Sequence, residues 1–433
     1  MRAWIFLTVS LAGAGPLAAQ MPDSAQLRHA RELHRLVPMI DGHNDFAWEV
    51  RAQYHGSFEG HDMAAGLPLF TGTDSLGHDI GFMTDIPRMR AGGMGGQFWS
   101  IYVPDTMIHA GATRVTLEQI DIIKRMEQRW PRVFLPARTA ADIERAHREG
   151  KIASLMGIEG GHSIENSIGA LRMFFDLGIR YMTLTWNNDL AWADANAGTR
   201  SHNGLTPFGL EVVREMNRLG MLVDISHVSD SVMAQVLRNS EAPVIFSHSS
   251  ARALSEHRRN VPDYILRMVP HNGGVVMVNF YCDFVDSVRV RWNRERAAAA
   301  SQARSQAGGD TAAVRRVINQ WESAHPEPPA PPLSIMADHI EHIRDVAGVD
   351  HVGYGSDFDG IECAPQGLND VSTFPRLTAE LVRRGWSDAD IEKVLGLNLL
   401  RVLRGAEATA RRLQASRPPS TATIGQLDSA AVR

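Results

Sequence analysis

Two side chains of the kind that bind metal ions lie one residue apart at the end of the first apolar segment of the chain. His43 and Asp45 follow the apolar run 36–40 within the segment Asp-Gly-His-Asn-Asp. In an extended strand successive side chains alternate between the two faces, so these two point to the same side and can bind one divalent ion together. Because a His-x-Asp pattern is a weak signal by itself, this interpretation depends on how the other strands end.

Further along, the chain repeats this arrangement of a short apolar run followed by a residue that can bind a metal or move a proton. The runs 152–158, 222–225, 244–246 and 351–354 are followed by Glu159, His227, His248 and Asp357. Taken singly, each is more often a satisfied core residue than a ligand. Several of them at successive strand ends would instead converge on one rim of a barrel. We therefore predict one site that contains all six residues.

The spacing of these residues divides the ligands between two metal positions. His227 and His248 are separated by one helix-plus-strand step, so they should lie on adjacent strands. Glu159 has glycines nearby on both sides, and one carboxylate can bridge two ions with its two oxygens. One position would use His43, Asp45 and Glu159, and the other would use Glu159, His227 and His248. Each would keep an open place for a bridging hydroxide, as a catalytic zinc site requires.

These residues can meet only if the strands that carry them are parallel neighbours. Besides the first run, we expect strands at 97–103, 152–158, 181–185, 222–225, 244–246, 274–278 and 351–354. We expect helices at 20–35, 116–130, 168–177, 208–219, 229–239, 264–268, 334–346, 370–384 and 387–403. This alternation predicts an α/β protein with a closed (β/α)8 TIM-type barrel. A dinucleotide-binding sheet is the alternative, but no Gly-x-Gly-x-x-Gly motif follows any expected strand.

Length and composition agree with one such barrel. The chain has 433 residues, of which 44% are hydrophobic and 21% charged, and its net charge is −5 without a basic stripe, which argues against nucleic acid as a partner. We expect a single domain over residues 20–415, with a helical insertion near 285–332 that ends in a proline-rich stretch. A polar tail at 416–433 should be disordered.

The N-terminus has the features of a secretory signal. Arg2 precedes a short apolar core at 3–14, and small residues at 16–19 predict cleavage near Ala19. The apolar core is too short to span a bilayer comfortably, and no later segment is long and apolar enough to do so. We therefore expect a signal peptide at 1–19 and an exported protein, periplasmic or secreted.

The chain has two cysteines, Cys282 and Cys363. Each lies shortly beyond one of the last two expected strands, and neighbouring strands of a closed barrel would bring them together. In an oxidising compartment a disulfide between them can persist. Two unpaired thiols are the alternative, and zinc binding by this pair is disfavoured.

From about residue 30 to 405 the chain resembles the membrane dipeptidase (renal dipeptidase) family of zinc metallopeptidases, a branch of the amidohydrolase superfamily. Long motifs carry the resemblance: Asp-Gly-His-Asn-Asp at 41–45, Glu-Gly-Gly-His-Ser at 159–163, the segment 223–229, Ser-His-Ser-Ser-Ala at 247–251, Arg-Arg-Asn-Val-Pro-Asp at 258–263 and Gly-Ser-Asp-Phe-Asp-Gly at 355–360. The resemblance implies a distorted barrel, two zinc ions bridged by Glu159 and a hydroxide, and hydrolysis of a dipeptide.

The resemblance also implies roles for two further residues. Asp357 would take a proton from the nucleophile and deliver it to the leaving amine, and Arg259 would bind the C-terminal carboxylate of the substrate. Arg258 and Asp359 are the alternatives for these two roles, although alignment to the motifs favours Arg259 and Asp357. We interpret Asp41 as a residue that does not bind the metal itself but hydrogen-bonds to residues that do. Because dimers are common in this family, the resemblance also implies a homodimer.

The chain departs from the family at Trp186, where many members carry a substrate-contacting histidine. An indole cannot act as an acid or base and offers a single hydrogen-bond donor. We expect Trp186 to be a substrate-binding residue that packs on the substrate side chain or donates from its ring nitrogen. The preferred dipeptide, and any tolerance of D-residues or β-lactams, stay open. So do two other readings: an amidohydrolase that acts on N-acyl amino acids, lactones or other small amides and esters, and a metal-dependent binding protein without turnover.

Overall fold

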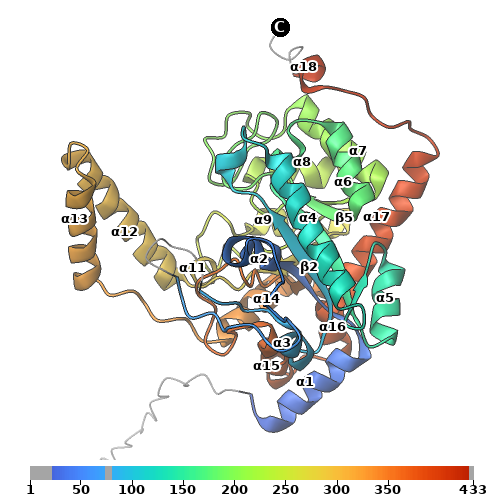
Figure 1. The fold of residues 1–433 in the computed structure, drawn as a ribbon, viewed down its shortest axis with the longest axis horizontal. Helices are drawn as coiled ribbons and strands as arrows, with labels where there is room; N and C mark the ends of the chain where they lie inside the picture. The colour runs from blue at the N-terminus through green and yellow to red at the C-terminus, as the bar shows by residue number, and fades with distance from the viewer. Residues whose placement is uncertain (1–21, 74–79, 429–433) are drawn as a thin grey trace, which may run out of the picture.

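Eight parallel strands close into a barrel at the centre of the molecule (Figure 1). The computed structural model describes residues 22–73 and 80–428. The barrel strands are β1 (Met39–Asn44), β2 (Met94–Tyr102), β4 (Ile152–Glu159), β5 (Ile179–Thr183), β6 (Leu222–Asp224), β7 (Ile245–Phe246), β8 (Val275–Val278) and β9 (Val352–Tyr354). The predicted (β/α)8 TIM-type fold is confirmed.

The barrel closes through β2, which pairs with β1 on one side and with β4 on the other. From β4 the order runs through β5, β6, β7, β8 and β9 back to β1, and every pairing is parallel. A further strand, β3 (Phe134–Pro136), pairs with β4 outside this ring. The sequence pattern did not predict β3.

Helices surround the strands and connect most of them. They include α1 (Ser24–Leu36), α4 (Ala112–Arg129), α5 (Ala140–Arg148), α6 (Ile168–Leu177), α7 (Pro207–Leu219), α8 (Asp230–Asn239), α9 (Asp263–Leu266), α10 (Val269–Asn272), α14 (Ser334–Ala347), α15 (Phe374–Arg383), α16 (Asp388–Glu392) and α17 (Asn398–Gln414). Side-chain caps start many of them; Thr206 and Ser229, for example, accept hydrogen bonds from backbone N–H groups of α7 and α8. A π-helical turn at Lys393–Leu397 joins α16 to α17.

The expected helix at 168–177 matches α6 at both ends, whereas two helices near the site, α2 (Phe46–Tyr54) and α3 (Ile86–Ala91), were missed. The N-cap residue of α2 is Asp45, whose side chain makes no capping hydrogen bond. This carboxylate is directed to the site instead, and the Asn44 side chain accepts from the Phe46 N–H at 2.9 Å.

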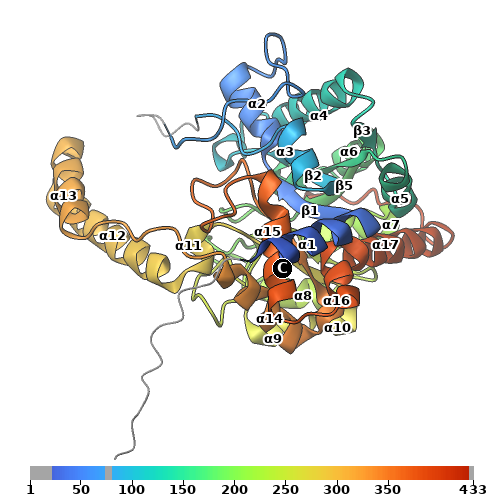
Figure 2. The same cartoon turned by 90° about the horizontal axis from the view of Figure 1, so that it is seen from below.

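The insertion after β8 forms a helical hairpin that projects from the barrel (Figures 1 and 2). It consists of α11 (Cys282–Val285), α12 (Ser287–Gln306) and α13 (Thr311–Ala324), and the proline-rich stretch then returns the chain to α14. Arg289 of α12 binds Asp283 and Glu327, and thereby ties the base of the hairpin to the returning chain. The predicted helical insertion is confirmed.

The polar tail differs from the expectation of disorder in the part that the structure describes. Residues 424–427 form α18 (Ile424–Leu427), and the Asp428 carboxylate accepts hydrogen bonds from the Thr206 hydroxyl and the Phe208 N–H at the start of α7. Composition suggested a solvated tail, but these polar groups find partners on the barrel. The expected signal peptide at 1–19 lies outside the described residues. No helix among residues 22–73 and 80–428 is long and apolar enough to cross a membrane.

Cys282 and Cys363 form a disulfide, which decides between the alternatives that the sequence left open. Their Cα atoms lie 5.5 Å apart, and the N–H of Cys282 also donates to the carbonyl of Cys363 at 3.0 Å. The bond therefore joins the chain segments that follow β8 and β9.

A buried histidine far from the strand ends gives a prediction for stability. His34 of α1 is bonded through Nδ1 to the Gly92 carbonyl and through Nε2 to the Thr378 hydroxyl, and burial lowers its pKa to about 4. The unfolded chain binds a proton near pH 6.5, while the folded protein does not until about pH 4. Stability from this group is complete above pH 6.5 and is lost as the pH falls toward 4.

We therefore expect the urea midpoint of unfolding to fall between pH 6.5 and 4, and to fall less steeply in His34→Gln. One proton corresponds to about 1.4 kcal/mol per pH unit. His109→Gln, at an exposed position, is the matched control and should keep the slope of the unmodified protein. An unchanged slope in His34→Gln would show that folding does not lower the pKa of His34.

Candidate metal centre

The carboxyl ends of the strands surround a cavity of about 790 Å³. Its lining combines acidic and aromatic side chains, including Asp45, Glu159, Asp357, Trp186, Tyr102 and Tyr281. Active sites of barrels of this fold lie at this end of the strands. All six residues predicted to form one site are found here, contributed by or just after β1, β4, β6, β7 and β9.

One half of the site is centred on His43, whose side chain is fully buried. Its Nε2 lies 3.3 Å from Asp45 Oδ2, 3.4 Å from Glu159 Oε2 and 3.9 Å from Asp357 Oδ1. His43 and Asp45 therefore lie side by side as expected, although Asp45 follows β1 as the N-cap of α2 and not as part of an extended strand, and a carboxylate from across the barrel faces them.

The other half is formed by His227 and His248 around the second oxygen of Glu159. Glu159 Oε1 lies 2.9 Å from His227 Nε2 and 3.6 Å from His248 Nε2, and these two ring nitrogens are 2.9 Å apart. The two oxygens of Glu159 thus face two different groups of ring nitrogens. This is the arrangement that a carboxylate between two metal ions requires.

The chemistry of this donor set fits divalent metal ions. Ligand atoms of two trios, His43 with Glu159 and His248, and His43 with Asp45 and Asp357, lie within 4.8 Å of one another. His43 Nε2 and Asp45 Oδ1 are buried and have no hydrogen-bond partner among the described residues. A buried polar atom without a partner is unfavourable, and a bound cation would satisfy both atoms. Neutral imidazole nitrogens and carboxylate oxygens are common ligands for such ions.

The buried acids and bases of the site shift the pKa values of one another. Burial lowers the pKa of His43, but the oxygens of Tyr181, Asp45 and Glu159 outweigh it and raise this pKa well above its usual value. Burial raises the pKa of Asp357 well above its usual value, with further contributions from Asp45 and Glu159. Burial, together with the positive charge of Arg259, lowers the pKa of His227 to about 3. A neutral His227 keeps a lone pair for a metal ion.

Two of the three site histidines are fixed by a hydrogen bond at Nδ1, whereas the Nδ1 atom of His227 has no partner among the described residues. His43 Nδ1 lies 2.8 Å from the Tyr181 hydroxyl, and His248 Nδ1 lies 2.7 Å from the Ser247 hydroxyl, which in turn donates to Asp224 at 2.6 Å. Such partners hold an imidazole in the tautomer that leaves Nε2 free.

The close approach of Tyr181 to His43 requires a glycine on the neighbouring strand. A Cβ on Gly157 would lie only 2.1 to 2.3 Å from the Tyr181 ring. The sequence identified neither Tyr181 nor Ser247 as part of the site. The available sequence signal for Tyr181 was Gly157, a residue without a side chain on the neighbouring strand, opposite an aromatic residue that points into the barrel.

Asp41 supports the site through hydrogen bonds to Ser356 and not through a hydrogen bond to His43. Its carboxylate accepts hydrogen bonds from the N–H and hydroxyl of Ser356, both at 2.7 Å, and from Gln97 at 3.0 Å. Asp41 therefore fixes Ser356, the residue before Asp357, just beyond the end of the last strand of the barrel.

Asp357 is held in a backbone conformation that few non-glycine residues adopt. Its φ is 69°, and the φ of Asp359 is 62°. Its N–H donates to the carbonyl of His43 at 3.1 Å, and its Oδ2 accepts from Asn279 at 2.7 Å. Asp359 also lines the cavity, but its Oδ1 accepts from the N–H of Met83 at 2.5 Å. Of the two aspartates, Asp357 is the one that faces His43.

Arg259 and Arg258 are placed very differently. Arg258 is exposed, whereas Arg259 is buried beside the site and donates to the Ser249 hydroxyl and the His248 carbonyl. The guanidinium of Arg259 lies 5.3 Å from the ring of Phe284. It forms no ion pair within 4.0 Å with any residue whose position is described. A buried cation without an anionic partner favours an anionic ligand.

Trp186 lies on the wall of the cavity, with its ring 4.9 Å from Tyr102 and 6.2 Å from His227. The two aromatic rings meet edge to face. Trp186 is thus placed to contact a ligand next to His227, and it replaces a polar group there with an apolar surface. Tyr102, which the sequence did not identify, completes this wall.

Comparison with known proteins agrees with this geometry. Residues 27–417 match the family model described as membrane dipeptidase, peptidase family M19. The chain belongs to the membrane dipeptidase family. It is a metallo-dipeptidase-type hydrolase, and the resemblance seen in the sequence motifs is confirmed.

Solved structures of a probable dipeptidase and of two metallopeptidases share the fold. A probable dipeptidase, PvdM, from Pseudomonas aeruginosa aligns with a TM-score of 0.72 and 24% identity over 89% of this chain and 99% of its own. A metallopeptidase called dipeptidase AC aligns with a TM-score of 0.68 and 27% identity, over 86% and 98% of the two chains. A metallopeptidase from Rhodobacter sphaeroides, bound to a phosphinate mimic of the dipeptide L-Ala-D-Ala, aligns with a TM-score of 0.66 and 26% identity, over 86% and 99%.

The Tyr181 hydroxyl gives a prediction for metal affinity. In Tyr181→Phe, His43 loses the hydrogen bond that fixes its tautomer and ring orientation, so we expect zinc affinity to fall roughly 10- to 100-fold. Titration against a competing chelator measures this. Tyr264→Phe, at a residue that is 52% exposed on α9, is the control and should bind zinc as the unmodified protein does. Equal affinity of both variants would rule out this role for Tyr181.

Proposed function

We propose that this member of the membrane dipeptidase family is an exported enzyme that uses two zinc ions to hydrolyse the peptide bond of dipeptides. The observation that carries the proposal is the position of Glu159, whose two oxygens face His43 on one side and the His227–His248 pair on the other. Asp45 lies beside His43, so each half of the site has a carboxylate and at least one imidazole.

His43, Asp45 and Glu159 would hold one zinc ion, and Glu159, His227 and His248 would hold the other. Bound there, the pair supplies Lewis acidity that polarises the scissile carbonyl and lowers the pKa of water to produce a nucleophile at neutral pH. The protein contributes the geometry: rings fixed by Tyr181 and Ser247 need no reorientation when substrate binds.

Asp357 moves the proton in this mechanism. It reaches the ligand side of the cavity at 3.9 Å from His43 Nε2, and it lines the cavity that would hold the substrate. As a carboxylate it takes a proton from the attacking water, and as a carboxylic acid it gives that proton to the leaving amine. Burial favours its neutral form and so lowers the penalty for holding the proton between the two steps.

Arg259 selects substrates with a free carboxylate close to the scissile bond. Its guanidinium is buried beside His248 and has no carboxylate partner within 4.0 Å among the described side chains. A carboxylate that binds Arg259 would place the adjoining peptide bond near the paired histidines, and a longer peptide would leave this cation without its partner. Dipeptides, including those with a D-residue at the C-terminus as in the mimic bound by the Rhodobacter sphaeroides enzyme, satisfy this requirement.

The disulfide supports an exported location, because such bonds persist in oxidising compartments. The acidic lining of the cavity favours a free amine on the substrate over an acyl group, which favours a dipeptidase over an enzyme for N-acyl amino acids. Trp186 would contact the substrate and set side-chain preference without taking part in proton transfer.

The proton-transfer role is tested with Asp357→Asn. An amide cannot accept and return the proton, so we expect kcat on dipeptides to fall roughly 10²- to 10⁴-fold with the zinc content unchanged. The comparison variant is Asp359→Asn, which should lose far less activity because its carboxylate is bonded to the Met83 N–H. Amino-acid release from L,L and L,D dipeptides is the assay. Zinc-loaded protein that turns over none of them, but hydrolyses acylated amino acids or lactones, would contradict the proposed function.

The carboxylate-binding role is tested with Arg259→Met. Loss of a charge-assisted contact worth about 1.5–3 kcal/mol should raise KM roughly 10- to 150-fold for a dipeptide. The corresponding dipeptide amide, which lacks the carboxylate, should show little change. Arg258→Met is the matched control at the exposed neighbour and should keep both values. A KM increase in Arg258→Met but not in Arg259→Met would assign the role to the other arginine.

A further inference from the structure

Both ends of one buried amide, that of Asn279, are used just beyond the end of β8. Its Nδ2 donates to Asp357 Oδ2 at 2.7 Å, and its Oδ1 accepts from the backbone N–H of Tyr281 at 2.6 Å. The side chain is fully buried. Asn279 therefore links the proposed acid/base residue to the chain segment that follows β8.

The orientation of this amide is fixed by its backbone partner. A backbone N–H can only donate, so the amide oxygen must face Tyr281 and the NH2 group must face Asp357. Asp357 Oδ2 is therefore always the accepting oxygen in this pair. Oδ1 is left as the oxygen that faces His43, and it is the oxygen placed to exchange a proton with the substrate.

Asp357 needs such a partner because neither its side chain nor its backbone selects this geometry alone. The terminal torsion of an aspartate is broad, so a free carboxyl group would present either oxygen. Its backbone lies in the left-handed region, with φ of 69°, a conformation that surrounding contacts must maintain. Asp41 and β1 fix the backbone through Ser356 and His43, whereas Asn279 fixes the carboxyl group.

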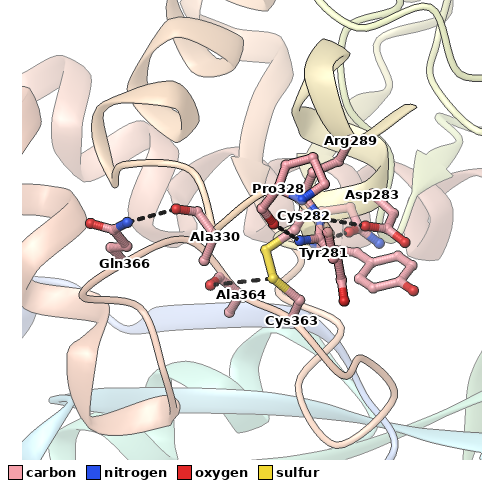
Figure 3. The surroundings of a disulfide bond; sticks show 11 residues. Tyr281, Cys282, Asp283, Arg289, Pro328, Ala330, Cys363, Ala364 and Gln366 are labelled. Carbon is pink, nitrogen blue, oxygen red and sulfur yellow. Dashed lines mark hydrogen bonds and ion pairs between the residues drawn. A yellow bond between two sulfur atoms is a disulfide. The ribbon is translucent and has the colours of Figure 1, made fainter. Parts of the chain in front are cut away.

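The segment that carries Asn279 is in turn anchored by the disulfide (Figure 3). Cys282 follows Tyr281 directly and is bonded to Cys363, which closes the loop that carries Asp357. Beside the disulfide, Asp283 binds Arg289, and Gln366 donates to the Ala330 carbonyl at 2.7 Å (Figure 3). The two loops are therefore joined covalently a few residues beyond the Asn279–Asp357 hydrogen bond.

We propose that Asn279 is a positioning residue that sets the reactive oxygen of Asp357, and that the Cys282–Cys363 disulfide holds Asn279 in place for this role. This inference rests on the proposed function of Asp357 as the general acid and base. It assigns a catalytic purpose to the amide after β8 and to the bond between the last two barrel loops.

The decisive variant is Asn279→Asp, which changes only one end of the side chain. Its carboxyl group still accepts from the Tyr281 N–H, so the local turn stays, but the fixed NH2 donor is replaced by an acid that must share a proton with Asp357. We expect kcat to fall roughly 10- to 100-fold, with KM and zinc content within about twofold of the unmodified protein and hydrogen exchange of the Tyr281 amide unchanged. Asn279→Leu, which loses both bonds, should show the same fall in kcat and also faster exchange of that amide.

A double-mutant cycle separates positioning from a structural role. In an Asp357→Asn background, Asn279→Asp should have little further effect on the residual kcat, because the group that it positions is gone. Asn272→Asp is the matched control: Asn272 also accepts from one backbone N–H and donates to one carbonyl, but at the end of α10. It should leave kcat unchanged. An unchanged kcat in Asn279→Asp would overturn the proposal. So would a double variant in which the fold-decreases in kcat of Asn279→Asp and Asp357→Asn multiply.

The disulfide is tested with the double variant Cys282→Ser/Cys363→Ser, and in parallel by reducing the folded zinc-loaded protein with a phosphine in case the variant does not fold. In both we expect a lower kcat at unchanged KM and zinc content, together with faster exchange of the Tyr281 amide; reoxidation should restore the reduced protein. An unaltered kcat after complete reduction would overturn the anchoring role.

These readouts also distinguish failure of the proposed function from failure of this inference. If the unmodified protein hydrolyses no dipeptide, the proposed function fails, and the positioning role fails with it. If the unmodified protein is active and Asp357→Asn is not, but the Asn279 and cysteine variants keep full kcat, the proposed function stands and the positioning role fails.

Discussion

The density of ionisable groups at the carboxyl ends of the strands is the constraint on which the rest of the structure depends. Three carboxylates lie within 4 Å of a single imidazole nitrogen of His43, and all of these side chains are buried or nearly so. Burial of charges is costly unless each finds a partner. The fold supplies some partners through Tyr181, Asn279 and the Ser247–Asp224 pair, and divalent cations would supply the rest.

This arrangement is maintained against local backbone preference. His227 and Asp357 have positive φ values of 64° and 69°, and such strain persists only where neighbouring structure enforces it. Gly360 shows how closely the groups are packed, because a Cβ there would lie 2.2 Å from Asp45 Oδ2. The site is therefore rigid for a physical reason: several unfavourable local conformations and buried charges are held together by one closed barrel.

The sequence predicted much of the fold because its strands are short buried runs that alternate with amphipathic helices, and the barrel, the insertion and α6 follow that pattern. The residues brought together in the site were also predictable, since ligand-type side chains follow successive strands. What escaped prediction has a common cause. Tyr181 and Asn279 act through hydrogen bonds between elements that are adjacent only in the closed barrel. Likewise the three-residue strand β3 gains its pairing from β4, and α2 begins at a residue whose side chain serves the site.

Closure of the barrel brings β1 beside β9, so the site joins the beginning of the described chain to a segment near its end. His43 and Asp45 are synthesised early, but Asp357 and the backbone contacts that hold it are added only after the projecting hairpin. A nascent chain that lacks β9 therefore has exposed ligands and no enclosed centre. Any metal ion bound before that point would lack Asp357 and the last strand that closes the barrel beside it. Asp357 therefore reaches His43 only when the last strand of the barrel has joined the first.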